Sequence, residues 1–172
     1  MALTRGKIVI AAIFVGVAAA FFGLYYSYSL QPPDVSSKIN VILANVQMKN
    51  IDRDDPTLMI VRVDFGIFNG SEQTLAVSKI DYELYANEAL LGRGSLSLED
   101  IPLTGRAPLY PSANTVLPSE MKLRKSPDIA DVWNRLQSGT TEDITWRTDG
   151  VAQIESAFSI FEVHFSSTFS TH

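Results

Sequence analysis

The sequence predicts an all-β protein, an antiparallel β-sandwich with one side helix, preceded by an N-terminal transmembrane helix. Three observations predict this architecture. Residues 8–30 contain no charged side chain. From Ile39 onward, apolar residues alternate with polar ones, which is the period of a half-buried strand. One later segment, residues 126–139, instead repeats its apolar residues at helical spacing.

The N-terminal segment IVIAAIFVGVAAAFFGLYYSYSL, residues 8–30, is long enough to cross a membrane. A helix rises 1.5 Å per residue, so 23 residues cover the roughly 30 Å hydrocarbon core of a bilayer. A cleaved signal peptide is the alternative, because Arg5 and Lys7 form a basic start. Secretory apolar cores usually run only about 7 to 15 residues, so a retained anchor is favoured.

The distribution of basic residues predicts the orientation. Arg5 and Lys7 precede the span, and no basic residue follows it until Lys38. The positive-inside rule then leaves the N-terminus in the cytoplasm and places the remaining chain outside the cell membrane, as a single-pass protein. We divide the chain into a cytoplasmic tip with the transmembrane helix at 1–30, a Pro-containing linker at 31–38 and the sandwich at 39–169.

Seven or so strands are expected after the linker, because turn residues separate the alternating segments. The apolar positions that define them are Ile39, Val41 and Leu43; Val61, Val63, Phe65 and Ile67; Ile80, Tyr82 and Leu84; Leu96 and Leu98; Leu117, Met121 and Leu123; Ile144 and Trp146; and Phe161, Val163 and Phe165.

The segment SPDIADVWNRLQSG, residues 126–139, predicts the helix. Ser126 suits the N-cap, Pro127 the first helical position and Gly139 the left-handed C-terminal position. Its apolar stripe is formed by Ile129, Val132, Trp133 and Leu136. Such a stripe usually packs on its own domain, so we expect Trp133 in the core, and a partner-binding face is the alternative.

A hairpin is predicted inside IDYELYANEALLGRG, residues 80–94. Asn87 and Glu88 should form the turn, so that Leu90 and Leu91 begin the return strand although they look like loop residues. Gly92 and Gly94 are expected to allow a bulge or a close approach of the backbone.

The surrounding segment FGIFNGSEQTLAVSKIDYELYANEALLGRGSLS, residues 65–97, resembles the type 2 late-embryogenesis-abundant family, also called LEA14-like or WHy (water stress and hypersensitive response) domains. Asn69 stands where that family often begins an Asn-Pro-Asn turn, here followed by Gly70 and Ser71. The later helix, WRTDGVAQIES and a last aromatic strand also follow the family's order, so the resemblance covers residues 39–169. It implies a fibronectin/immunoglobulin-like sandwich with a side helix, no shared catalytic residue, and membrane-anchored members.

Charge and composition exclude several functions. From Asp34 onward there are 12 Lys and Arg against 19 Asp and Glu, with no basic cluster, so nucleic-acid binding is not expected. Cysteine is absent, which excludes disulfides and thiolate metal sites. We expect no enzyme, catalytic residue, cofactor or metal, because no nucleophile elbow, phosphate loop or multi-histidine set occurs. His164 is expected on the surface.

One acidic loop, NIDRDDP, raises the possibility of a calcium site. Asn50, Asp52 and Asp54 occupy alternate positions, as in a calcium loop. Asp55 stands where glycine is needed and Val61 where a bidentate Glu is needed, so a solvated turn is favoured.

Two sets of residues are candidate sites. Ala12, Gly16, Ala20 and Gly23 form a small-residue stripe on the predicted span, where a partner membrane protein could pack; composition alone is the alternative. Asn69-Gly70-Ser71 is a glycosylation sequon on the predicted outside, so Asn69 could carry a glycan or form an unmodified turn.

Two functions remain after these exclusions. The first is a non-catalytic accessory or assembly subunit of a membrane complex, or an envelope adaptor, in contact with membrane lipid and a membrane-protein partner. The alternative is a desiccation or stress protector that acts on membranes or client proteins. The strand patterning and 10% aromatic residues favour a stably folded chain over a disordered protector.

Overall fold

The computed structural model describes residues 14–23, 35–98, 105–157 and 159–170, in two separate units, Met1–Val35 and Ser36–His172. In the first unit, residues 14–23 are helical. Among the described residues, no helix is both long and apolar enough to cross a membrane. The predicted span at 8–30 extends beyond the described helix at both ends.

The second unit is almost entirely antiparallel β-structure with one α-helix. Its elements, in chain order, are η1 (Ser36–Lys38), β1 (Ile39–Ile51), β2 (Leu58–Asn69), β3 (Leu75–Ala86), β4 (Ala89–Ser97), β5 (Pro108–Leu109), β6 (Ala113–Arg124), η3 (Pro127–Ile129), α2 (Ala130–Ser138), β7 (Thr145–Glu155) and β8 (Ile160–Ser170).

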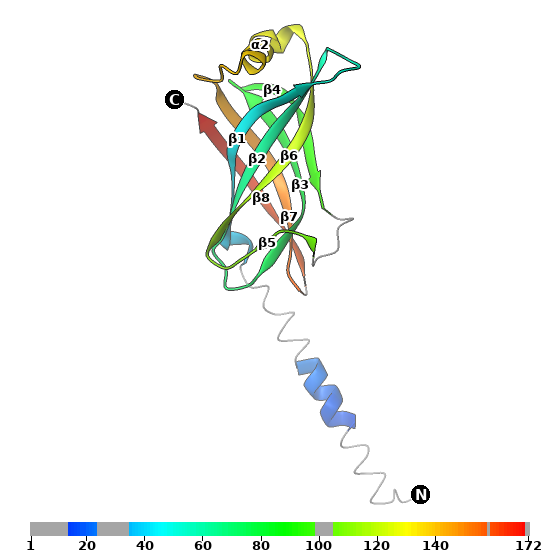
Figure 1. Cartoon of the computed structure of the whole chain (residues 1–172). Helices are drawn as coiled ribbons and strands as arrows, with labels where there is room; N and C mark the ends of the chain where they lie inside the picture. The colour runs from blue at the N-terminus through cyan, green and yellow to red at the C-terminus, as the bar shows by residue number, and fades with distance from the viewer. Residues whose placement is uncertain (1–13, 24–34, 99–104, 158, 171–172) are drawn as a thin grey trace, which may run out of the picture. The chain divides into compact units, whose positions relative to one another are not determined.

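The strands form two sheets that pack face to face (Figure 1). The first has the order β1-β2-β6, and the second has the order β4-β3-β7-β8, with the short β5 paired to β3. β1 lies near β8 at one side of the sandwich, and β4 lies near β6 at the other. The predicted antiparallel sandwich with one helix is therefore confirmed for the described residues.

The core lies between the sheets, on the apolar positions that the alternation predicted. Val61, Val63, Phe65 and Ile67 of β2 are fully buried, and the alternate residues of β1 and β3 are also buried. The strands extend beyond the segments that the sequence pattern indicated, because a bulge interrupts the alternation inside a strand and hides the rest of it. One falls between Leu43 and Asn45 in β1. The short β5 was not predicted.

The hairpin between β3 and β4 is the one that the sequence predicted. Asn87 and Glu88 have φ angles of 48° and 69°, both left-handed, as a two-residue type I′ turn requires. Leu90 and Leu91 lie in β4. Leu84 pairs with Gly92 and Tyr85 with Leu90, so a bulge lies beside Gly92 as expected.

The helix lies at the end of the sandwich opposite η1 (Figure 1). It begins as a 3₁₀ turn after Ser126, whose side chain makes no capping hydrogen bond, and continues as α2. Gly139 ends it with a φ of 73°, and its N–H donates to the carbonyls of Arg135 and Leu136. The predicted positions of Ser126 as N-cap, Pro127 at the first helical position and Gly139 at the C-terminus are confirmed, although the Ser126 side chain makes no capping hydrogen bond.

Two glycines make room for the Tyr82 ring on the inner face of the second sheet. Gly94 and Gly150 flank Tyr82 on the neighbouring strands. A Cβ on Gly94 would lie 2.3 Å from the Tyr82 ring, and one on Gly150 would lie 2.5 Å from the Asp81 carbonyl oxygen. The Tyr82 ring meets Phe65 edge-on, and its hydroxyl donates to Ser119 Oγ at 3.0 Å, which joins the two sheets. Gly94 thus allows the close approach that was predicted.

A buried hydroxyl on β7 provides a test of this packing. Thr148 is fully buried, and its Oγ1 has no hydrogen-bond partner among the described residues. Thr148→Val keeps the shape and removes the desolvated hydroxyl, so we expect the free energy of unfolding to rise by about 1 kcal/mol. Denaturant unfolding measures the change.

Ser119 supplies the matched control, because it is also a buried hydroxyl but accepts the Tyr82 hydrogen bond. Ser119→Ala should lower stability by about 1 to 2 kcal/mol, since it leaves the Tyr82 hydroxyl buried without that acceptor. Equal losses in both variants would show that Thr148 Oγ1 has a partner in solution.

Candidate functional site

A hollow with a volume of about 960 Å³ lies on the outer face of the second sheet. It is shallow and open. It is lined by the outward side chains of two cross-strand rows, Ser95-Asp81-Val151-His164 and Arg93-Glu83-Asp149-Ser166, which are polar except for Val151. We call these eight residues the outer-face site.

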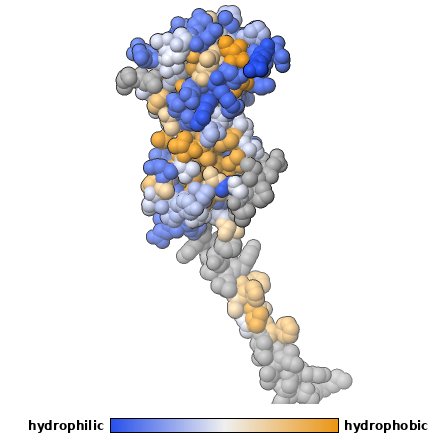
Figure 2. Space-filling view, viewed as in Figure 1, coloured by the Kyte–Doolittle hydropathy of each residue, from blue (hydrophilic) through white to orange (hydrophobic). Residues whose placement is uncertain are grey.

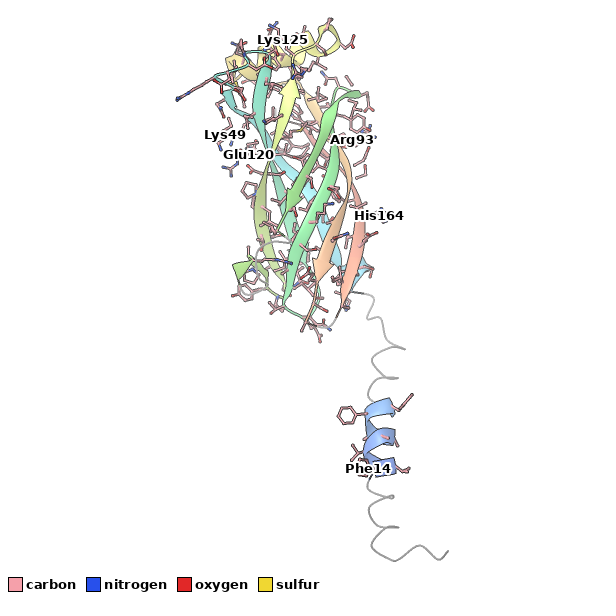
Figure 3. The ribbon with its side chains drawn as sticks, turned by 90° about the vertical axis from the view of Figure 1, so that its right-hand side faces the viewer. Phe14, Lys49, Arg93, Glu120, Lys125 and His164 are labelled. Carbon is pink, nitrogen blue, oxygen red and sulfur yellow. The ribbon has the colours of Figure 1, made fainter. Side chains whose placement is uncertain are left out.

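The pleat of the sheet positions these side chains. Asp81 and Glu83 of β3 point outward because Tyr82 and Leu84 between them point into the core. β4 and β7 flank β3, and β8 continues the rows beyond β7. Figure 3 shows Arg93 of β4 and His164 of β8 on the same side of the domain, away from Lys49 and Glu120 of the other sheet.

Each of the three carboxylates of the outer-face site makes hydrogen bonds and an ion pair with neighbouring side chains. Asp81 accepts from Ser95 Oγ at 2.7 Å and pairs with Lys79 at 2.8 Å. Glu83 accepts from Tyr85 Oη at 2.6 Å and from Arg93 Nε at 2.8 Å.

Asp149 completes this set, opposite Glu83. It accepts from Ser166 Oγ at 2.7 Å and pairs with Arg147. The Arg147 guanidinium also lies 4.1 Å from the centre of the Tyr85 ring and 3.5 Å from Glu88. The Arg147 guanidinium therefore bridges Asp149 to Glu88 of the hairpin turn.

These contacts keep two of the carboxylates ionised. Burial pushes the pKa of Asp81 upward, but the Lys79 and Ser95 contacts outweigh it, and the pKa lies below its ordinary value. The hydrogen bonds from Tyr85 and Arg93 hold the pKa of Glu83 below its ordinary value, although the Asp149 charge opposes them. Both groups are therefore anions at neutral pH, available to accept hydrogen bonds from water or hydroxyl-bearing solutes and poor proton donors.

No metal site accompanies them in the part of the chain that the structure describes, where no group of three or more acidic or histidine side chains could hold an ion. The acidic loop after β1 is a turn held by its own side chains. Asp52 Oδ1 accepts the N–H of Asp54 at 2.9 Å, and Asp55 Oδ1 accepts from Thr57 N and Oγ1. His164 is exposed, as expected.

The predicted glycosylation position has a structural role. Asn69 is fully buried. Its Nδ2 donates to the carbonyls of Gln73 and Leu109, both at 2.8 Å, and its Oδ1 accepts from the N–H and Oγ of Ser71 at 3.0 and 2.7 Å. The Asn69 amide is thus enclosed in the folded domain and holds this turn together, and glycosylation of the sequon stays a prediction.

The small-residue stripe falls partly outside the described residues, because Ala12 precedes them. Gly16, Ala20 and Gly23 lie on the helix at 14–23, at spacings that share one face. A Cβ added to Gly16 or Gly23 would meet no atom within 4 Å. Within the described helix, open space therefore lies beside both glycines.

The sequence analysis missed the outer-face site. Its carboxylates were visible as the polar positions of alternating segments, and this pattern is also typical of any solvated sheet face. The order of the strands in the sheet brings the two rows together, and no local pattern specified that order.

Comparison with known proteins gives the fold. No family model matches the sequence, and no curated protein matches it. Among solved structures, AT1g01470 from Arabidopsis thaliana matches with a TM-score of 0.51 and 13% identity, over 77% of this chain and 82% of that one. A protein from Archaeoglobus fulgidus matches with a TM-score of 0.43 and 15% identity, over 77% and 96% of the two chains.

A third structure, of a candidate late embryogenesis abundant (LEA) protein, At2g46140.1, matches with a TM-score of 0.41 and 14% identity, over 97% of this chain and 87% of that one. At these identities, similarity concerns the fold alone. The match to AT1g01470 places the present sandwich among known folds.

Proposed function

We propose that this chain is a non-catalytic stress protector of the LEA14-like type, which acts on membranes or client proteins during desiccation. The observation that carries the proposal is the folding of residues 65–97. This segment resembles the LEA14-like pattern, and it forms the end of β2, the β3 strand and the β3-β4 hairpin of a sandwich with a side helix. The resemblance implied that fold.

The surface chemistry is consistent with this role. The outer-face site presents ionised carboxylates and serine hydroxyls on a rigid sheet, which can hydrogen-bond to water or to polar groups as water is lost. In the described residues the serines hydrogen-bond to the carboxylates, and Lys79 and Arg93 form ion pairs with Asp81 and Glu83.

The location that we propose is the outer side of the cell membrane. The uncharged residues 8–30 would span the bilayer once, with Arg5 and Lys7 in the cytoplasm, and the linker at 31–38 would join the span to the sandwich. An N-terminal anchor of this kind would hold the protector at the surface that it protects.

Survival on drying tests the proposal. Cells that produce the full chain should survive drying and rewetting better than cells that produce Val63→Asp, which retains the anchor but places a charge in the fully buried centre of β2. Immunoblotting should first show equal amounts of both chains in the membrane fraction. Equal survival at equal abundance would contradict the protector function.

An accessory subunit of a membrane complex is the second candidate, and the small residues Gly16, Ala20 and Gly23 on one face of the helix favour it. Helices associate in lipid through close packing of small residues. Gly16→Ile should then remove stoichiometric partners from the detergent-extracted chain, while Val15→Ile, beside it on the helix, should retain them. Native mass spectrometry that finds a partner-free wild-type chain would exclude this candidate.

A further inference from the structure

The η1 end of the sandwich differs in its exposed side chains from the opposite end. Phe68, Tyr110 and Ile160 are respectively 38%, 59% and 67% exposed there. We call these three residues the apolar tip. At the other end, the exposed residues around α2 and the β1-β2 turn are mostly polar or charged, and the charged ones include Arg53, Asp54, Lys125, Asp128 and Asp131. Figure 2 shows hydrophilic surface over most of the α2 end and an apolar patch at about mid-height on the face in view.

The three side chains come from separate segments that meet at this end. The Phe68 ring lies over Gly70, whose N–H donates to the Lys38 carbonyl at 2.9 Å, directly beside the start of β1. The loop that carries Tyr110 is joined to the same turn, because the Ser112 N–H donates to the Asn69 carbonyl at 2.7 Å.

Ile160 completes the apolar tip at the start of β8, the strand that lies against η1. Few charges accompany these three side chains. The Arg106-Glu155 pair near this end is largely buried, and the exposed charges of the described residues beside the apolar tip are Lys38, Glu72 and Glu162.

The apolar surface also continues along one sheet. Ile42 of β1 and Val116 of β6 are exposed on the outer face of the three-stranded sheet, on either side of Gly66. They lie in the half of that face nearest the η1 end. The far half carries the Lys49-Glu120 and Arg62-Asp64 ion pairs. Polarity therefore changes along the strands.

The short segment between the predicted span and the folded unit limits how far the apolar tip can lie from the membrane. Only residues 31–35 separate Leu30, the end of the predicted span, from Ser36, where the folded unit begins. An extended chain covers at most about 3.6 Å per residue, so the Cα atoms of Leu30 and Ser36 lie within about 22 Å of each other. A span that ends at Leu30 thus keeps the η1 end close to the lipid headgroups.

From this we infer that the apolar tip is a membrane-contact surface, with Phe68, Tyr110 and Ile160 inserted at the lipid headgroup–acyl boundary. This inference rests on the anchor in the proposed function. Aromatic rings such as Tyr110 favour that boundary, and interfacial apolar side chains enter it by about 5 to 10 Å. The sandwich would stand with its charged α2 end away from the bilayer.

Lipid quenching of single labels tests the inference, and the absence of native cysteine makes each label unique. Ile160→Cys and Tyr110→Cys, each in the full chain, carry an environment-sensitive fluorophore, and the chain is reconstituted into vesicles that contain spin-labelled lipid. Gln137→Cys, exposed on α2, is the matched control. We expect the spin-labelled lipid to quench both tip labels at least about twofold more than the control.

Two further measurements separate this inference from the anchor. Resistance to an alkaline carbonate wash reports the anchor, and iodide in the buffer reports exposure of each label to water. A carbonate-resistant chain whose tip labels are quenched no more than Gln137→Cys would overturn the tip contact and leave the anchor standing.

Tip labels that iodide and lipid both fail to reach would show that a second copy or another protein covers the tip, and this would also overturn the inference. A chain that the wash removes would overturn the anchor and the tip contact together.

Discussion

Trp133→Ala is expected to lower the free energy of unfolding by about 3 to 5 kcal/mol, as large-to-small core substitutions do. Trp133 is 1% exposed and lies on α2 between Val132 and Leu136, which are also buried. The Lys125 ammonium lies 5.8 Å from the centre of its ring. Removing the indole would leave a cavity where the helix closes the end of the sandwich.

Thermal unfolding measures this loss, which should appear as a fall in melting temperature of roughly 10 to 20 °C for a domain of this size. Gln137→Ala is the control, because it changes an exposed residue of the same helix and should alter stability by at most about 0.5 kcal/mol. If Trp133→Ala has the same melting temperature as the wild type, α2 is not docked on the core in solution. Its apolar stripe then becomes a partner-binding face.

The sequence predicted those elements whose periodicity is local. Val61, Val63, Phe65 and Ile67 alternate with outward residues and are all buried, because a single buried face forces a period of two. Likewise, the α2 stripe follows the helical period, and both tryptophans lie in the core as expected. Asn87 and Glu88 were identifiable because a two-residue hairpin needs two left-handed residues.

Interactions between distant segments could not be predicted in this way. The pairing of β3 with β7 brings Glu83 opposite Asp149, although the two residues are 66 positions apart in the sequence. Strand order depends on packing of the whole sandwich, and this packing leaves no local period. The short β5 pairs through Leu75 and Leu109, and its two residues are too few to show any alternation.

Asn69 illustrates a different limit. The motif Asn-Gly-Ser is the same whether its amide is exposed or enclosed, so the sequon alone could not distinguish a glycan acceptor from a turn. The enclosing carbonyl of Leu109 belongs to a strand 40 positions away. Only the packed domain shows that both amide protons are already used.

Asn69→Asp is expected to lower the free energy of unfolding by about 3 kcal/mol at pH 7, although the two side chains have nearly the same shape. The substitution turns Nδ2, which donates to the Gln73 and Leu109 carbonyls, into an acceptor that faces two acceptors. A buried group without its hydrogen bonds costs about 1 to 3 kcal/mol, and more when it is charged. Chemical unfolding of both proteins measures the difference.

The pH dependence separates this mechanism from a simple loss of packing. Burial and the two carbonyls favour the protonated carboxyl, so the pKa of the introduced group should be higher in the folded state than the ordinary value of about 3.9. The destabilisation caused by such a raised pKa is zero below the pKa that the carboxyl has in the unfolded chain. It grows as the pH rises from about 4 toward the pKa that the carboxyl has in the folded state. The difference in unfolding free energy between wild type and Asn69→Asp should therefore be smallest near pH 3 and widen toward neutrality.

Asn69→Ala cannot titrate, so its loss of unfolding free energy relative to the wild type should stay constant over the same range. A pH-independent gap for Asn69→Asp would mean that the turn rearranges to expose the carboxylate, and the Gln73 and Leu109 carbonyls would then not enclose residue 69 in solution.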